Sequence, residues 1–219
     1  MVVHLGGRMI EVKNLTKTYE KNRILNDINI LFPKNKINFI LGKNGVGKTT
    51  LFKCILNLEK YEGKINLSRN KIFCMFDNPP FYNNLNGLEN IELITQLYGL
   101  KKKEYRIDKT LLNEVLLKKK VKYYSYGQRK KLVLAIIDIL QPDILLLDEA
   151  SNGLDYDTIR YLKDRLIIWK QNMTILITGH QLDFYEKVSE NIFVIKNQTI
   201  FEVKDKTLTL EELYDKYVK

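Results

Sequence analysis

Cysteine is scarce in this 219-residue chain, and long apolar runs are lacking. The 2 cysteines, Cys54 and Cys74, lie in apolar surroundings without the spacing of a metal site, which indicates reduced core residues of a cytosolic protein. No uninterrupted apolar stretch approaches about 18 residues, so we expect no membrane-spanning helix. A secretory signal is not visible either. The length fits one domain with room for a smaller subdomain.

The formal net charge is +10 at pH 7. Such a charge suits a nucleic acid partner or an anionic membrane surface. A lysine-rich composition that only solvates the exterior explains the charge equally well. Charge alone therefore leaves the partner open.

The stretch Gly42 to Thr50 carries the pattern G-x-x-x-x-G-K-[ST]. It follows an apolar run at 37–41 and precedes a segment at 51–56 with helical spacing, and this context favours phosphate binding over a chance glycine turn. Glycines let backbone N–H groups converge on phosphate oxygens at a helix N-terminus. A lysine there contacts the β- and γ-phosphates, and a threonine hydroxyl binds Mg²⁺. The candidate ATP-binding residues of this loop are Gly42, Asn44, Gly45, Val46, Gly47, Lys48, Thr49 and Thr50.

Further strands and helices are predicted around this loop. Residues 1–8 look detached from the alternating pattern that follows, and we interpret them as an extension or a cloning remnant. Asn35 can take the left-handed conformation of a turn, and Gly63 is expected to break the chain before a short strand. The expected strands are 9–15, 28–32, 64–67, 72–76, 144–147 and 173–177, and the expected helical regions are 88–117, 126–140 and 158–170.

Charged side chains follow two of the apolar strands. Asp148 and Glu149 come directly after 144–147, and adjacent carboxylates at a buried strand end are costly unless they hold a metal or do chemistry. His180 follows 173–177. A lone histidine is more often structural, but ligands in parallel sheets sit at the carboxyl ends of strands. We therefore treat all three residues as site candidates.

These motifs resemble the ATP-binding subunit of an ATP-binding-cassette (ABC) transporter over residues 9 to about 205. The glycine loop resembles the family's P-loop, residues 124–128 its signature, and residues 145–149 its Walker B strand. The resemblance implies that Glu149 is the catalytic carboxylate, that His180 and Lys48 assist it, and that Tyr19 stacks on adenine. It also assigns residues 152–155, including Asp155, to a loop at a dimer interface. The signature residues, which bind the ATP of a partner subunit, are Ser125, Tyr126, Gly127 and Gln128; the Mg²⁺ candidates are Thr49 and Asp148, with Asp77 as an additional one.

The resemblance also implies the architecture. We expect an α/β fold with a P-loop NTPase core, an N-terminal antiparallel β subdomain and an inserted helical subdomain at about 78–126. Residues 9–219 would then form a single ATPase domain. The compact middle of the chain is similar to small bacterial exporters.

Three residues depart from the family pattern. Tyr126 stands where the signature usually has its first glycine, so a side chain near the γ-phosphate is expected to slow closure. Asp77 stands where glutamine is usual, and it would approach Mg²⁺ or water as a shorter anion. Ala150 replaces a common proline, and we expect little effect.

The resemblance implies the cofactors and partners. Mg²⁺ and ATP would bind between two ATPase subunits, which are identical or homologous, at the cytoplasmic face of the membrane. Separate transmembrane subunits would carry the substrate, by export rather than import. The alternative is an ABC ATPase acting on nucleic acid, a ribosome or cofactor assembly. The single cassette without a coiled-coil insertion argues against that alternative, and nucleic acid is not the expected partner; a P-loop kinase would lack the signature.

A docking surface is expected between Asp77 and about Leu100. Phe81, Tyr82, Leu85 and Tyr98 would line a groove for a short helix of the membrane partner. The same side chains could equally belong to the local core.

Overall fold

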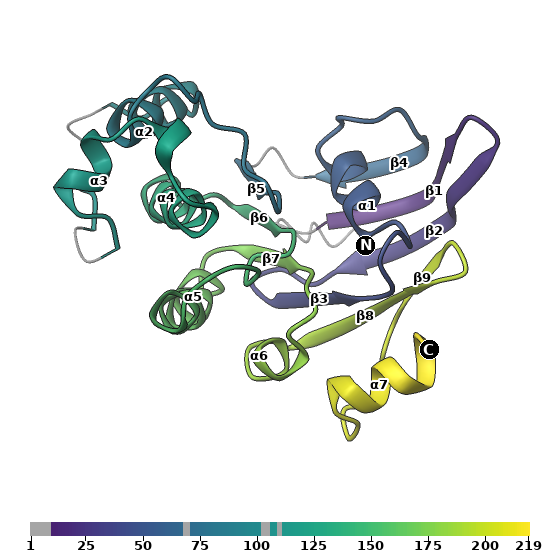
Figure 1. Ribbon diagram of the computed structural model, residues 1–219. Helices are drawn as coiled ribbons and strands as arrows, with labels where there is room; N and C mark the ends of the chain where they lie inside the picture. Colours follow the sequence, from purple (N-terminus) through teal and green to yellow (C-terminus); the bar gives the residue numbers. More distant parts are fainter. Residues whose placement is uncertain (1–9, 68–70, 102–105, 109–110) are drawn as a thin grey trace, which may run out of the picture.

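The computed structural model describes residues 10–67, 71–101, 106–108 and 111–219 (Figure 1). Residues 1–8, interpreted from the sequence as an extension, lie outside the described residues, as does Met9, the expected start of the first strand.

Two sheets form the framework (Figure 1). One is antiparallel with the order β2-β1-β4, and the other has the order β5-β6-β7-β3-β8-β9, in which only the β8–β9 pair is antiparallel. The expected α/β fold with an antiparallel β part is thereby confirmed. The strands are β1 (Ile10–Tyr19), β2 (Asn22–Phe32), β3 (Ile37–Leu41), β4 (Glu62–Leu67), β5 (Ile72–Met75), β6 (Ile144–Leu147), β7 (Thr174–Ile177), β8 (Asn191–Lys196) and β9 (Thr199–Glu202).

Helices cover both faces of the six-stranded sheet. Figure 1 shows α4, α5 and α6 along one side, whereas α1 lies between the two sheets. The helices are α1 (Lys48–Ile55), α2 (Gly87–Leu97), α3 (Glu114–Lys118), α4 (Tyr126–Leu140), α5 (Tyr156–Trp169), α6 (Leu182–Glu186) and α7 (Leu210–Tyr217), with a 3₁₀ turn, η2, at Val121–Tyr123.

The two faces of the sheet form two hydrophobic clusters because side chains alternate along a strand. In β6, Leu145 and Leu147 pack toward α4 and α5, while Ile144 and Leu146 pack toward α1 and the antiparallel sheet. All four are fully buried. Since neither face of the sheet reaches water, polar chemistry is confined to the strand ends.

A third cluster forms the core of the helical part. It joins α2, α3 and η2 to one face of α4, while the opposite face of α4 packs on the sheet. The helical periodicity at 88–117 does not produce one helix: α2 ends at Leu97, and Gly99 (φ 80°) follows. A left-handed glycine just past a helix is a common helix terminator. The division into subdomains at about 78–126 stays a prediction.

Several expected boundaries were wrong. The second strand begins at Asn22 rather than Ile28. Gly63 does not break the chain but lies inside β4, with φ 94°, where an added Cβ would collide with the carbonyl group of Asn14 on β1. Its role is close strand approach rather than a turn. The left-handed conformation expected at Asn35 is confirmed by its φ of 53°.

The end of the chain contains elements that the sequence analysis did not anticipate. β8 and β9 form an antiparallel pair at one edge of the sheet, and α6 and α7 pack on the α5 side. Both cysteines are unpaired, as expected. Within the described part of the chain, no helix combines the length and the apolar character that crossing a bilayer requires.

The α5 helix offers a matched test of this packing. Leu166 is fully buried against the sheet, whereas its neighbour Ile167 is 44% exposed. We expect Leu166→Ala to lower the free energy of unfolding by about 2–5 kcal/mol because it leaves a cavity. Ile167→Ala should lower it by less than about 1 kcal/mol, since little burial is lost. Denaturant unfolding of both variants measures the difference, and equal losses would contradict the assigned face of α5.

Candidate active site

The glycine loop positions Lys48 at the start of α1. Gly47 precedes it with φ 116°, a conformation that side-chain-bearing residues rarely adopt, and Gly45 has φ 77°. Lys48 is buried, and its Nζ donates to the carbonyl oxygens of Gly42 at 2.7 Å and Lys43 at 2.9 Å. Burial lowers the pKa of Lys48, while Glu149 and Asp148 oppose that shift.

A pocket of about 170 Å³ opens above this loop. Glu149, far away in sequence, lines it together with the loop, so the pocket joins the phosphate-binding pattern to the expected catalytic carboxylate. Free N–H groups at the N-terminus of α1 and a buried cation suit a polyphosphate. The lining residues are Asn44, Gly45, Gly47, Lys48, Thr49, Thr50 and Glu149.

Asp148 connects three elements beside the pocket. Its Oδ2 accepts a hydrogen bond from the Thr49 hydroxyl at 2.7 Å, and its Oδ1 accepts one from the Thr178 hydroxyl at 2.7 Å. Asp148 is only 4% exposed, so these donors compensate the cost of burying its carboxylate. The contact joins α1, the end of β6 and the end of β7.

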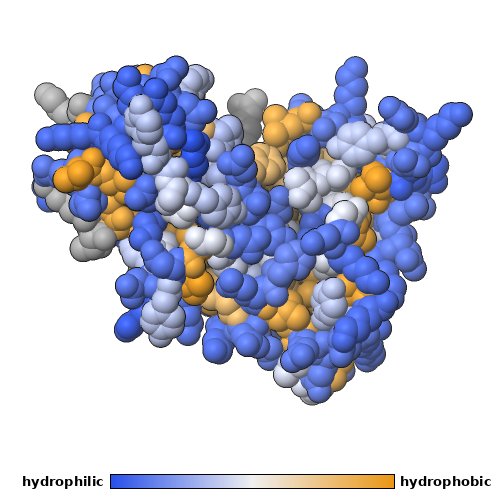
Figure 2. All heavy atoms as spheres, in the orientation of Figure 1, coloured by the Kyte–Doolittle hydropathy of each residue, from blue (hydrophilic) through white to orange (hydrophobic). Residues whose placement is uncertain are grey.

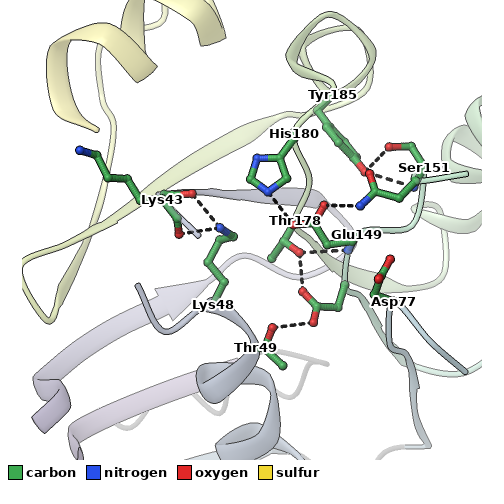
Figure 3. A network of polar contacts seen from close by, with 12 residues as sticks. Lys43, Lys48, Thr49, Asp77, Glu149, Ser151, Thr178, His180 and Tyr185 are labelled. Atoms are coloured by element: carbon green, nitrogen blue, oxygen red, sulfur yellow. Dashed lines mark hydrogen bonds and ion pairs between the residues drawn. The ribbon is translucent and has the colours of Figure 1, made fainter. Parts of the chain in front are cut away.

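Glu149 is fixed from several sides (Figure 3). Its backbone has φ 55°, and its N–H donates to the Thr178 hydroxyl at 3.2 Å. Its Oε1 lies 3.0 Å from Nε2 of His180, and its Oε2 accepts from the Asn152 amide at 3.0 Å. A left-handed glutamate is unusual and costs about 1–3 kcal/mol, so the surrounding contacts must hold it.

Asp77 is bound on the signature side of the site. Its carboxylate accepts a hydrogen bond from the Tyr126 hydroxyl and lies 3.2 Å from Nζ of Lys130. Figure 3 places Asp77 beside Glu149, on the opposite side from Lys48. The Tyr126 hydroxyl and the Lys130 ammonium group thus already engage this carboxylate. A role for Asp77 as a Mg²⁺ ligand stays a prediction.

The signature residues begin α4. The Ser125 hydroxyl accepts from the Gln128 N–H at 3.2 Å, and the Gln128 side chain accepts from the Ser125 N–H at 3.0 Å. This capping box fixes the helix start that the sequence predicted near Ser125 or Tyr126. None of residues 125–128 is among the described residues that line the P-loop pocket. One chain therefore does not bring its own signature onto its own phosphate loop.

Tyr19 is the last residue of β1. Lys17 Nζ sits 4.2 Å from the centre of its ring, while Glu59 holds Lys17 at 3.0 Å. Burial, followed by the neighbouring Glu59, raises the pKa of Tyr19, and the Thr50 hydroxyl also interacts with it. A base that stacks on Tyr19 would use the ring face opposite Lys17.

Asp155 caps α5 and is mostly exposed. Its carboxylate accepts from the Thr158 N–H at 2.9 Å and pairs with Lys131 at 2.9 Å. The hydrogen bonds from Thr158 and Lys131 lower the pKa of Asp155 to about 2. Its side chain is 60% exposed, so it stays accessible to a partner beside the signature helix.

The four residues of the expected docking groove separate into two groups. Tyr82 is 59% exposed. Tyr98 donates its hydroxyl to the Ile72 carbonyl at 2.7 Å and packs on Phe73, and Phe81 packs against two clusters. Leu85 is half-buried. The core interpretation thus fits Tyr98 and Phe81 better, and Tyr82 fits the surface interpretation.

Two site residues received no role from the sequence. Thr178 follows β7 just as Asp148 follows β6, so the strand-end argument that selected His180 could have found it. Lys130 lies in a basic run, which is typical of a solvent-exposed helix face, yet its side chain is fully buried. Nothing in the sequence indicates this burial.

The oxygen ligands present fit Mg²⁺. A hard cation bound through substrate phosphates needs only one or two protein ligands and retains water. The Thr49 hydroxyl and the Asp148 carboxylate, already 2.7 Å apart, supply such a pair. Within the described residues, no group of three or more His, Cys, Asp and Glu forms a separate metal cluster.

Comparison with known proteins agrees with this geometry. A family model described as "ABC transporter" matches residues 25–152. The lantibiotic transport ATP-binding protein SrtF of Streptococcus pyogenes is 34% identical, with 96% of this chain and 97% of SrtF covered. The bacitracin transport ATP-binding protein BcrA of Enterococcus faecalis is 33% identical over 89% of this chain and 68% of its own. A solved ATP-binding subunit of an ABC transporter superposes with a TM-score of 0.88 at 25% identity, covering 96% of this chain and all of that one.

The position of Tyr19 gives a first binding test. We expect Tyr19→Ala to weaken ATP binding several-fold, because stacking contributes on the order of 1 kcal/mol. Tyr19→Phe and Tyr19→Trp keep a ring and should bind ATP like the unmodified chain. Titration with a fluorescent ATP analogue measures all three. Equal affinity across the series would remove Tyr19 from the adenine site.

Proposed function

This chain belongs to the ABC transporter family, as an ATP-binding subunit that hydrolyses ATP, and we propose that it powers export of a peptide antibiotic through separate transmembrane subunits. The support for the substrate class is its end-to-end similarity to SrtF, a lantibiotic transport protein, together with its similarity to BcrA. The support for hydrolysis at this site is one observation: Glu149 lines the same pocket as Lys48 and Thr49.

We propose the following roles within the pocket. Lys48 and the N–H groups of the loop bind the β- and γ-phosphates, and Tyr19 stacks on the adenine. Glu149 orients and polarises the attacking water, while His180, 3.0 Å from it, contacts the γ-phosphate. Thr49 and Asp148 would hold Mg²⁺, which supplies charge neutralisation of the phosphates when bound.

A second ATPase subunit would complete the site. The Ser125–Gln128 segment lies apart from its own P-loop pocket but offers free N–H groups at the start of α4. In our proposal these groups cap the γ-phosphate bound by the partner, and Asp155 lies at the same interface. ATP then acts as a ligand shared by two subunits, and hydrolysis releases them.

The helical part would contact the membrane subunits at the cytoplasmic face of the membrane. Tyr82, Leu97 and Val115 are 59%, 74% and 80% exposed. Figure 2 shows hydrophobic residues gathered over the region of α3, on a face that is otherwise largely hydrophilic. Exposed apolar side chains of this kind mark interaction surfaces. Transport is favoured over action on nucleic acid, ribosomes or cofactor assembly because the named relatives are transport proteins.

The two-subunit site predicts that binding and hydrolysis can be separated. Glu149→Gln keeps the size of the side chain but removes the charge that polarises water and repels the γ-phosphate. We expect this variant to lose turnover, to bind ATP and to persist as a dimer in Mg-ATP but not in Mg-ADP. Gel filtration detects the dimer. A variant that hydrolyses ATP normally and stays monomeric would exclude Glu149 as the catalytic carboxylate.

The signature supplies the control for this experiment. Adding Ser125→Arg to Glu149→Gln should abolish the dimer, because a bulky cation replaces the cap, without weakening ATP binding to the P-loop. Ser125→Arg also breaks a capping box, which costs about 1 kcal/mol. Thr209→Arg breaks the equivalent capping box on α7 and should leave the dimer intact.

The substrate proposal predicts a cellular phenotype. In the organism that carries this chain, replacing Lys48 with Ala should increase killing by a lantibiotic or by bacitracin severalfold, because export would stop. The minimum inhibitory concentration of each compound measures this. Lys206→Met, at an exposed position outside the helical part, is the control. Unchanged sensitivity to both compounds would contradict the peptide antibiotic proposal but would leave the ATPase assignment untouched.

A further inference from the structure

Lys130 is the one lysine among the described residues whose side chain has no exposed area at all, and it lies next to the active site. It points from α4 toward the end of β6, where its Nζ donates to the backbone carbonyl oxygen of Glu149 at 2.6 Å. The same Nζ pairs with Asp77 at 3.2 Å and lies 4.7 Å from the centre of the Tyr126 ring. Its ammonium group therefore contacts a carbonyl, a carboxylate and an aromatic ring beside the site.

A buried cation persists only where partners repay its desolvation. Burial lowers the pKa of Lys130, and the nearby carboxylate of Asp77 opposes that shift. The Glu149 carbonyl and the Tyr126 ring add a hydrogen bond and a cation–π contact. The number of specific partners indicates that Lys130 is held in one place.

The contact to Glu149 acts on a strained backbone. Glu149 has φ 55°, and the peptide groups on its two sides are fixed independently: the Thr178 hydroxyl accepts from the N–H at 3.2 Å, and Lys130 donates to the C=O. Together these bonds determine the direction of the Cα–Cβ bond, and thus where the carboxylate enters the pocket. Without Lys130, the carbonyl would keep only the longer hydrogen bond from the Asn152 N–H, at 3.2 Å, and the strain would favour rotation.

We propose that Lys130 is a positioning residue for Glu149, held by Asp77 and Tyr126, and that it sets the rate of hydrolysis without contributing to ATP binding. This inference rests on the proposed catalytic role of Glu149. Lys130 does not itself line the P-loop pocket and contacts only the backbone of one lining residue, Glu149, so its effect should appear in kcat and not in KM.

The test uses the full-length chain with Lys130→Met, which keeps the length and apolar stem of the side chain. We expect kcat for ATP hydrolysis to fall about 10- to 100-fold, because small displacements of a catalytic group have effects of this size, with KM unchanged within about twofold. Lys130→Arg keeps the charge and donors and should recover most of the rate. Lys206→Met removes an exposed lysine in the loop between β9 and α7 and should have no effect.

A second readout separates positioning from a loss of structure. If Lys130 acts through Glu149, Lys130→Met should resemble Glu149→Gln and accumulate the Mg-ATP dimer on gel filtration. A misfolded variant would lose ATP binding and the dimer together. Should Lys130→Met not fold, Asp77→Asn removes the counter-charge at a half-exposed side chain and should lower kcat about three- to tenfold, again without changing KM.

The results separate the positioning role of Lys130 from the catalytic role of Glu149. If Glu149→Gln stops turnover and traps the dimer while Lys130→Met and Asp77→Asn hydrolyse ATP at the normal rate, the positioning role is overturned and the proposed function stands. A rise in KM equal to the fall in kcat/KM would also overturn it. If Glu149→Gln itself keeps normal turnover, the proposed role of Glu149 fails first.

Discussion

The carboxylate of Asp148 fixes the geometry on which the rest of the site depends. It accepts one hydrogen bond from α1, through Thr49, and one from the end of β7, through Thr178, each at 2.7 Å. A carboxylate that is almost fully buried cannot lose a donor without a large penalty. The start of the P-loop helix and the ends of two adjacent strands are therefore held in one relative position. Glu149 is the next residue after Asp148, so its backbone is positioned by the same contacts.

Burial of both faces of the six-stranded sheet determines where this junction can lie. Every residue of β3, β6 and β7 is buried, and none of them is charged. The two polar side chains, Asn38 and Thr174, lie near the amino ends of their strands and are engaged in hydrogen bonds. The carboxyl ends, where the chain leaves the sheet, are the nearest places that combine low dielectric with access to water. Charge interactions are stronger in such a setting than on an open surface. The same packing that stabilises the sheet thus creates the environment that phosphoryl transfer requires.

The sequence predicted the parts of the site that are formed by contiguous segments or by residues directly after an apolar strand. β3, the glycine loop and α1 are contiguous, and Asp148, Glu149 and His180 end apolar strands, so local pattern was sufficient. Lys130 was missed because its ion-pair partner, Asp77, is about fifty residues away in the chain, and a lysine in a basic run looks solvated. The final strands and helices were missed as well, since β9 and α7 lack the long apolar runs that identified the central strands.

Two departures from the family pattern, Tyr126 and Asp77, explain each other in the structure. Considered separately, the tyrosine would obstruct the signature and the shorter carboxylate would fall short of the site. In the folded chain the Tyr126 hydroxyl donates to Asp77, and the tyrosine ring covers Lys130. An added Cβ at Gly153 would collide with that ring, so the loop after Glu149 accommodates it as well.

Tyr126, Asp77 and Lys130 therefore act as one interacting group, and the two departures from the family pattern are not independent substitutions. A glycine at 126 alone would remove a donor from Asp77 and the aromatic cover from Lys130, while the buried cation remained. A glutamine at 77 alone would leave Lys130 without its counter-charge. Because each single change exposes the cost of a buried charge that the others now offset, their effects cannot be additive. Tyr126 in the signature is therefore needed by Asp77 and Lys130 beside it. Because Lys130 contacts Glu149, a change at Tyr126 should also affect the position of the proposed catalytic carboxylate.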